Sequence, residues 1–102
     1  EIFEIITKPI NGVYHGTYSD KVDSIFKYGL SRMNRKHIHI AESDSSISGK
    51  RKSADTKIYI DMKTAINDGI LFFRSKNNVI LTRGNDDGIL LPKYLSLQCI
   101  KN

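Results

Sequence analysis

Three histidines lie close together in the first half of the chain, and two of them have a spacing that brings imidazoles to one side of a strand. His15 is followed by Gly16 and Thr17, and a single residue separates His37 from His39. Residues two apart in a β-strand point to the same face, so the rings of His37 and His39 are expected to point the same way. A glycine beside a histidine lets a ligand approach the backbone. The pattern predicts the floor of a binding site.

Three imidazoles are also the ligand set of some catalytic zinc sites, so a zinc hydrolase is one alternative. The sequence places no acidic or cysteine ligand close to His15, His37 and His39. A His-x-His pair is more often the polar face of a strand than a metal site. We therefore predict no metal site.

Basic side chains offer a second kind of chemistry, the binding of phosphate. Lys and Arg number 16 against 11 Asp and Glu, a formal net charge of +5 that favours a polyanionic partner. A solvated basic face that keeps a small domain in solution explains the same excess. Arg51 is of special interest because Gly49 frees the backbone just before it. An arginine there can hold a phosphate through charge-assisted bonds worth about 1.5–3 kcal/mol, although spacing alone fits a surface arginine equally well.

Familiar nucleotide-binding loops are missing from the sequence. Neither G-x-G-x-x-G nor G-x-x-x-x-G-K-[ST] occurs. A Rossmann domain and a P-loop are therefore not supported.

Short elements must position these residues. A strand at 13–17 leads into a helix capped by Ser19 or Asp20 and ended by Gly29, and a strand at 37–41 follows a basic turn. The other predicted elements are an edge strand at 1–6, a loop at 42–48, a strand at 56–61, a helix at 62–68 and hairpin strands at 71–74 and 79–82. A last strand is predicted to start at 90–91 and to continue at 94–100, after Pro92. Many short strands with two small helices predict an α+β domain.

The length of 102 residues predicts one domain with a single small core. Because the first residue is Glu1 and not Met, we expect an excised domain or a processed chain. The lone Cys99 excludes a disulfide within the chain and favours a reducing compartment, cytoplasmic or nuclear. No apolar run approaches the roughly 20 residues that span a bilayer, so no membrane partner is expected.

Seven blocks of the sequence occur in the order found in the tRNA 2′-phosphotransferase family, also called KptA. They are VYHGTY, GLSRM-x-R-x-HIHIA, SGKR, KIYIDM, DGI-x-F-x-RS, N-x-VILT-x-GN and DG-x-L-x-PKYL. The chain resembles this family over nearly its whole length from Val13 onward.

The resemblance implies an ADP-ribosyltransferase-like split β-sheet with two short helices, in which NAD binds without a Rossmann fingerprint. It also implies a reaction that consumes NAD. The splice-junction 2′-phosphate of a tRNA, or of another RNA with an internal 2′-phosphate, attacks the nicotinamide ribose at C1″ and expels nicotinamide. The ribose 2″-hydroxyl then takes the phosphate, which leaves ADP-ribose 1″,2″-cyclic phosphate and RNA with a 2′-hydroxyl.

Residues that match the family's motifs acquire expected roles from the resemblance. Arg51 matches the arginine used in transesterification and is the predicted catalytic residue. The predicted NAD-binding residues are His15, Gly16, Thr17, Ser31, Arg32, Arg35, His39 and Val79. A neutral Val79 suits an attacking group that is already an anionic phosphate, because such a group needs no general base. Departures from the family pattern are Lys50, Asn78, Arg83 and a short loop at 42–48.

Full-length members of the family carry an N-terminal lobe that supplies much of the RNA site, and this chain starts after it. The whole of 1–102 is therefore predicted to be the NAD-binding lobe, inactive or weakly active alone. A noncatalytic module that binds ADP-ribose or RNA is the alternative, since it would share the same basic surface.

Overall fold

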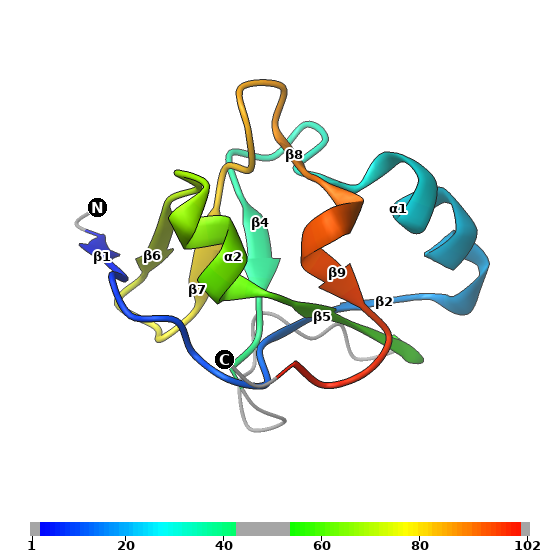
Figure 1. Ribbon diagram of the computed structural model, residues 1–102, viewed down its shortest axis with the longest axis horizontal. Coiled ribbons are helices and arrows are strands. Elements are labelled where there is room, and N and C mark those ends of the chain that lie inside the picture. Colours follow the sequence, from blue (N-terminus) through cyan, green and yellow to red (C-terminus); the bar gives the residue numbers. More distant parts are fainter. Residues whose placement is uncertain (1–2, 43–53, 101–102) are drawn as a thin grey trace.

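Nine short strands and two short α-helices make up the structure, a computed structural model that describes residues 3–42 and 54–100 (Figure 1). The strands are β1 (Glu4–Ile5), β2 (Tyr14–Thr17), β3 (Leu30–Ser31), β4 (Ile38–Ile40), β5 (Thr56–Ile60), β6 (Phe72–Arg74), β7 (Ile80–Thr82), β8 (Ile89–Leu90) and β9 (Leu95–Ser96). They form three sheets with the orders β1-β6-β7-β4, β2-β5-β9 and β3-β8, and every pair is antiparallel.

The helices are α1 (Val22–Tyr28) and α2 (Met62–Asn67), and single 3₁₀ turns lie at Ser19–Lys21 and Pro92–Tyr94. In Figure 1, α1 lies at the opposite end of the molecule from β1. Antiparallel sheets with two short helices agree with the predicted α+β class. Neither helix of the described ranges has the length and apolarity needed to cross a bilayer.

A backbone bridge joins the two larger sheets, and it sets the geometry of the site. Tyr14 at the start of β2 forms an isolated bridge with Ala41, just after β4. The Tyr14 amide donates to the Ala41 carbonyl at 3.0 Å, and the Ala41 amide donates to the Tyr14 carbonyl at 2.7 Å. His15 follows Tyr14 in β2, and His39 precedes Ala41 by two residues in β4, so the bridge brings these two histidines beside each other. Beyond this place the two strands diverge into different sheets.

The core lies between these sheets and the helices. Ile38 and Ile40 lie on the buried face of β4, and the alternating residues of β5 are buried in the same way. These positions confirm the predicted alternation in both strands. The fully or almost fully buried cluster also contains Val13, Leu30, Ile58, Ile60, Met62, Ala65, Phe72, Ile80, Leu90, Tyr94 and Leu95.

Helix α1 begins differently from the prediction. A 3₁₀ turn precedes it, and within the described part of the chain no side chain caps either segment. The backbone amide of Ser19 instead donates to the Asp55 carboxylate at 2.8 Å, which attaches this turn to the start of β5. The predicted end of the helix at Gly29 is confirmed, because Gly29 has φ +96° and its amide donates to the Ile25 carbonyl at 2.7 Å.

Two strand predictions need correction. The last strand was predicted at 94–100, but the 3₁₀ turn at 92–94 precedes a strand of only two residues, Leu95–Ser96. Pro92 starts that turn, and Ser96 Oγ accepts the Gln98 amide at 3.0 Å, a local bond that ends the strand. Leu90 was predicted to be extended but lies in the separate strand β8, and its pairing with β3 was not predicted, because two-residue segments are too short to show alternation.

Candidate functional site

A cavity of about 440 Å³ lies where α1, β3 and the ends of β2 and β4 come together. Its lining includes six of the nine residues predicted from sequence to form the site: His15, Thr17, Ser31, Arg32, Arg35 and His39. These residues belong to three separate stretches of chain, namely β2, β3 with the turn after it, and β4. The fold therefore gathers most of the predicted site into one concavity, which we call the histidine cavity.

The two central histidines are held together by a hydrogen bond. His15 Nδ1 lies 2.8 Å from the carbonyl oxygen of His39. Because a carbonyl oxygen only accepts hydrogen bonds, His15 Nδ1 carries a proton and donates it. This bond fixes the orientation of the His15 ring at the cavity floor.

The rings of His37 and His39 both line the histidine cavity, as their spacing predicted. Burial lowers the pKa of His39, and the nearby positive charge of Arg35 lowers it further. Burial also lowers the pKa of His37, with smaller contributions from the charges of Arg83, His39, Lys36 and Arg32. Both imidazoles are therefore neutral near pH 7, and arginines supply the positive charge of this region.

One polar atom of the cavity is buried without a partner. Within the described residues, His39 Nδ1 is the buried side-chain nitrogen or oxygen that makes no hydrogen bond. Leaving such a group unsatisfied costs about 1–3 kcal/mol. The pKa of His39 is also raised slightly by a hydrogen bond with the backbone of His37, a smaller effect than those of burial and Arg35.

Two hydrogen bonds hold Arg32 in place, and Gly88 lies directly against its side chain. The Arg32 amide donates to the Gly88 carbonyl at 2.9 Å, and its guanidinium donates to the Arg35 carbonyl at 2.9 Å. A Cβ on Gly88 would lie 2.6 Å from Arg32 Nε and 2.9 Å from Arg32 Cγ. The glycine at position 88 is therefore what allows the Arg32 side chain to occupy this place.

Two residues that sequence reasoning missed form an apolar rim to the cavity. Tyr28 is 63% exposed at the end of α1, and Met33 is 78% exposed in the turn after β3. Met33 has φ +53°, and its amide donates to Ser31 Oγ at 2.9 Å. Large apolar side chains left exposed beside cationic groups suit a ligand with a planar ring and an anionic part. The exposure of these two side chains is a property of the fold, so the sequence offered no signal that singled them out.

Two predicted site residues of the described ranges are not part of this lining. Gly16 is buried in β2 opposite Lys57, and Val79 is only 6% exposed just before β7. Neither belongs to the lining that the described part of the chain presents. Arg51, the predicted catalytic residue, lies outside the described residues, as does most of the predicted loop at 42–48.

The zinc alternative gains no support from the geometry. Across residues 3–42 and 54–100, no group of three or more His, Cys, Asp or Glu side chains is arranged to hold a metal ion. The His15 ring instead donates to the backbone of His39.

Comparison with known proteins matches this chain to one family. A sequence model described as RNA 2′-phosphotransferase, Tpt1/KptA family, matches residues 2–84. The chain belongs to this family. The match spans all residues of the candidate site, including Arg51, so the Tpt1/KptA resemblance seen in the sequence is confirmed.

Individual relatives agree with the Tpt1/KptA assignment. The chain is 50% identical over 86 residues to tRNA 2′-phosphotransferase 1 of Danio rerio, which covers 80% of this chain and 38% of that protein. It is 49% identical over 84 residues to tRNA 2′-phosphotransferase 1 of Homo sapiens, which covers 78% of this chain and 33% of that protein. It is 32% identical over 94 residues to a probable RNA 2′-phosphotransferase of Flavobacterium johnsoniae, covering 90% of this chain and 49% of that protein. The chain thus spans between a third and a half of the length of these relatives.

Proposed function

We propose that this chain is the NAD-binding lobe of an intracellular, NAD-dependent RNA 2′-phosphotransferase. In this proposal the sheets that diverge from the bridge between Tyr14 and Ala41 are the split β-sheet of an ADP-ribosyltransferase-like fold. An N-terminal lobe outside this sequence would supply the rest of the RNA site. The substrate would be a tRNA or another RNA with an internal 2′-phosphate, and the products ADP-ribose 1″,2″-cyclic phosphate, nicotinamide and RNA with a 2′-hydroxyl.

The observation that carries the proposal is the convergence of six family-matched residues on the histidine cavity. The cavity also has features that fit an ADP-ribose group. Arg32 and Arg35 supply guanidinium groups for a pyrophosphate, and Tyr28 with Met33 supplies an apolar rim for a base.

NAD, when bound, supplies an electrophilic ribose carbon with a good leaving group. The residues of this chain would bind and orient it. Arg32 is held by the Gly88 and Arg35 backbone, so it meets a phosphate with little further loss of freedom. Arg32 and Arg35 would attract the 2′-phosphate, which is already an anion and needs no general base to make it a nucleophile.

Arg51 is proposed to stabilise the negative charge on the transferred phosphate in both steps. Removing one preorganised donor from a site of this kind typically lowers kcat by about 10²–10³. Its neighbours Lys50 and Lys52 carry the same charge, and Lys52 therefore offers a matched control on the same stretch of chain.

The test is a turnover assay on the natural protein that carries this chain, with a 2′-phosphorylated RNA oligonucleotide and NAD. Mass spectrometry should detect ADP-ribose 1″,2″-cyclic phosphate and RNA of unchanged length that has lost its 2′-phosphate. Arg51→Ala should lower kcat about 100-fold or more with little change in KM for NAD, and Lys52→Ala should leave both values unchanged. Binding of ADP-ribose without any product would refute the transferase and support the noncatalytic module.

A further inference from the structure

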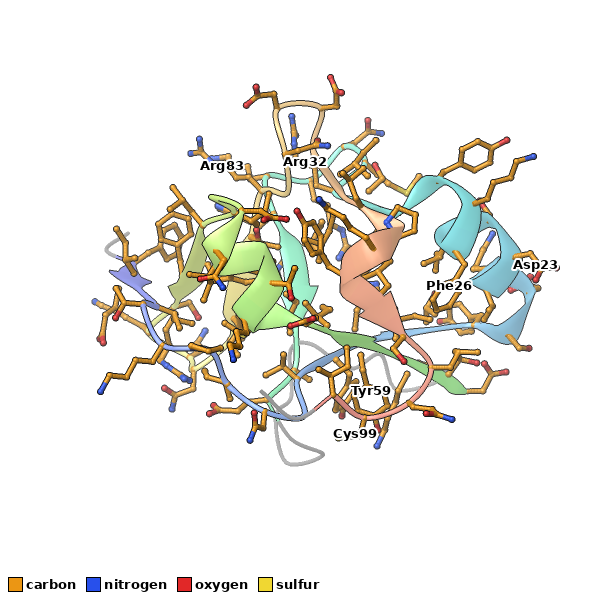
Figure 2. All side chains as sticks on the ribbon, viewed as in Figure 1. Asp23, Phe26, Arg32, Tyr59, Arg83 and Cys99 are labelled. Atoms are coloured by element: carbon orange, nitrogen blue, oxygen red, sulfur yellow. The ribbon has the colours of Figure 1, made fainter. Side chains whose placement is uncertain are left out.

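A second concavity, of about 500 Å³, lies beside the histidine cavity and shares Arg32 with it. We call it the second groove, and its lining includes Arg32, Leu71, Phe73, Arg83, Asp86 and Gly88. None of these residues except Arg32 was assigned a role in binding NAD. Figure 2 shows Arg32 and Arg83 along the same edge of the molecule.

The charge of the second groove favours an anion. In the described residues that line it, two guanidinium groups, those of Arg32 and Arg83, are offset by one carboxylate, that of Asp86. Arg32 and Arg83 also lie close enough to His37 for their charges to lower its pKa, which places both cations around the same ring. Arg32 therefore contributes its positive charge to both the histidine cavity and the second groove.

An apolar wall accompanies this charge. Leu71 is 57% exposed, and Phe73 is half-buried in the four-stranded sheet. The Phe73 ring lies 6.2 Å from that of Phe3, tilted by 48°, so a second aromatic side chain supports it. Unpaired bases of single-stranded nucleic acids stack on aromatic side chains while arginines hold the phosphates beside them.

The loop that closes the second groove is firmly built. Asn85 Oδ1 accepts the backbone amides of Asp87 at 2.9 Å and Ile89 at 3.1 Å. A Cβ on Gly84 would lie 2.6 Å from the backbone of Ile89, so the loop packs too tightly there for any other residue. A ligand in this groove would therefore meet a preformed surface.

We propose that the second groove binds the RNA strand next to the nucleotide that carries the 2′-phosphate. Arg83 would contact a phosphodiester of the flanking strand, and a flanking base would lie against the wall of Leu71 and Phe73. The inference rests on the proposed function, because the reactive 2′-phosphate would reach the histidine cavity past Arg32.

The first experiment varies substrate length in the natural protein that carries this chain. A 2′-phosphorylated dinucleotide and an oligonucleotide of about eight residues would be compared as substrates with NAD. Arg83→Ala should raise KM for the longer RNA about threefold to tenfold and leave KM for the dinucleotide and for NAD unchanged. Lys76→Ala removes one charge from the turn at the opposite end of the β6-β7 hairpin and should change none of these values. Equal effects of Arg83→Ala on both RNA lengths, or no effect on either, would overturn the proposal.

The second experiment measures RNA binding without turnover, and it predicts effects of opposite sign for two variants of the second groove. Fluorescence anisotropy would measure the binding of labelled, unphosphorylated single-stranded RNA as salt is raised. Asp86→Asn should tighten binding about threefold, and Arg83→Ala should weaken it and reduce the slope of log K against log salt by about 0.7. If both variants bind the RNA with the same affinity and the same salt slope as the original protein, the proposal that the second groove binds RNA is contradicted. Equally effective competition by polyglutamate of the same charge would also contradict it, because the surface would then bind anions in general.

The two experiments separate this inference from the proposed function. A protein that yields no product from any 2′-phosphorylated RNA refutes the phosphotransferase, and the anisotropy measurement still decides whether the second groove binds RNA. If the Arg83→Ala variant turns over both RNA lengths as well as the original protein does, the phosphotransferase is supported and the proposed role of the second groove is overturned.

Discussion

Gly88→Ala tests whether Arg32 is a binding residue whose position depends on a missing side chain. Gly88 has φ +77°, and a Cβ there would lie 2.6, 2.9 and 3.1 Å from Nε, Cγ and Cδ of Arg32. The substitution has two costs. Placing alanine in a left-handed conformation costs about 1–2 kcal/mol of folding free energy, and relieving the contacts requires the Arg32 side chain to leave its place.

The expected loss of binding follows from the contact that Arg32 is proposed to make. A hydrogen bond between a guanidinium and a phosphate contributes about 1.5–3 kcal/mol, so displacing it should raise the Kd for ADP-ribose about tenfold to 150-fold. Arg32→Ala should cause a similar loss of affinity with a smaller loss of stability. The double variant should bind no more weakly than either single variant, because both remove the same contact.

Gly69→Ala is the matched control for the backbone. Gly69 has φ +96°, and nothing lies within 4 Å of a Cβ built there. The Gly69→Ala variant should therefore lose about as much folding free energy as Gly88→Ala and keep the original Kd for ADP-ribose. Calorimetric titration with ADP-ribose and urea unfolding measure the two quantities separately. Unchanged ADP-ribose affinity of Gly88→Ala, or binding losses that add in the double variant, would refute the role of Arg32.

Three further predictions concern stability. Thr82 is fully buried and its hydroxyl donates to the Leu71 carbonyl at 2.7 Å, so Thr82→Val should cost about 1–2 kcal/mol in urea unfolding, whereas an equal stability of the two proteins would contradict this bond. Phe72→Ala removes a fully buried ring and should cost about 3–5 kcal/mol, which a change below 1 kcal/mol in urea unfolding would contradict. The pKa values of His37 and His39 are lowered in the folded chain, so the unfolded chain takes up protons more readily. The contribution of the two neutral histidines to the free energy of unfolding should be complete above about pH 6.5 and should be lost as the pH falls through their folded-state pKa values. His37→Gln should flatten that decline in unfolding measured from pH 8 to pH 5, and an unchanged slope would argue against it.

Local chemistry explains which elements the sequence predicted correctly. The alternation of Ile38 and Ile40 with His37 and His39 placed one pair in the core and the other in the histidine cavity, as periodicity requires. Glycine placement was equally informative, since Gly29 ends α1 with a positive φ as predicted. These features depend only on neighbours in the chain.

Features that depend on distant partners could not be predicted. The pairing of Leu30 with Leu90 joins segments sixty positions apart, and each is too short to carry a periodic pattern. The placement of Arg32 under Gly88 likewise depends on a contact between two turns that the linear sequence does not reveal. One missed feature is local: the cap of α2 is made by Asp61, whose side chain accepts the Thr64 amide at 3.1 Å, because alternation assigned Asp61 to the preceding strand.

Histidine NMR offers the most direct measurement of the central claim, because the chain has three histidines and all of them line the same cavity. Imidazole signals would be followed as ADP-ribose is added and again as pH is varied. We predict that all three signals shift with one dissociation constant and that the pKa of His39 rises when the anionic ligand is bound, since negative charge favours the protonated ring. Histidine signals that stay unchanged at millimolar ADP-ribose would contradict the assignment of this cavity to NAD.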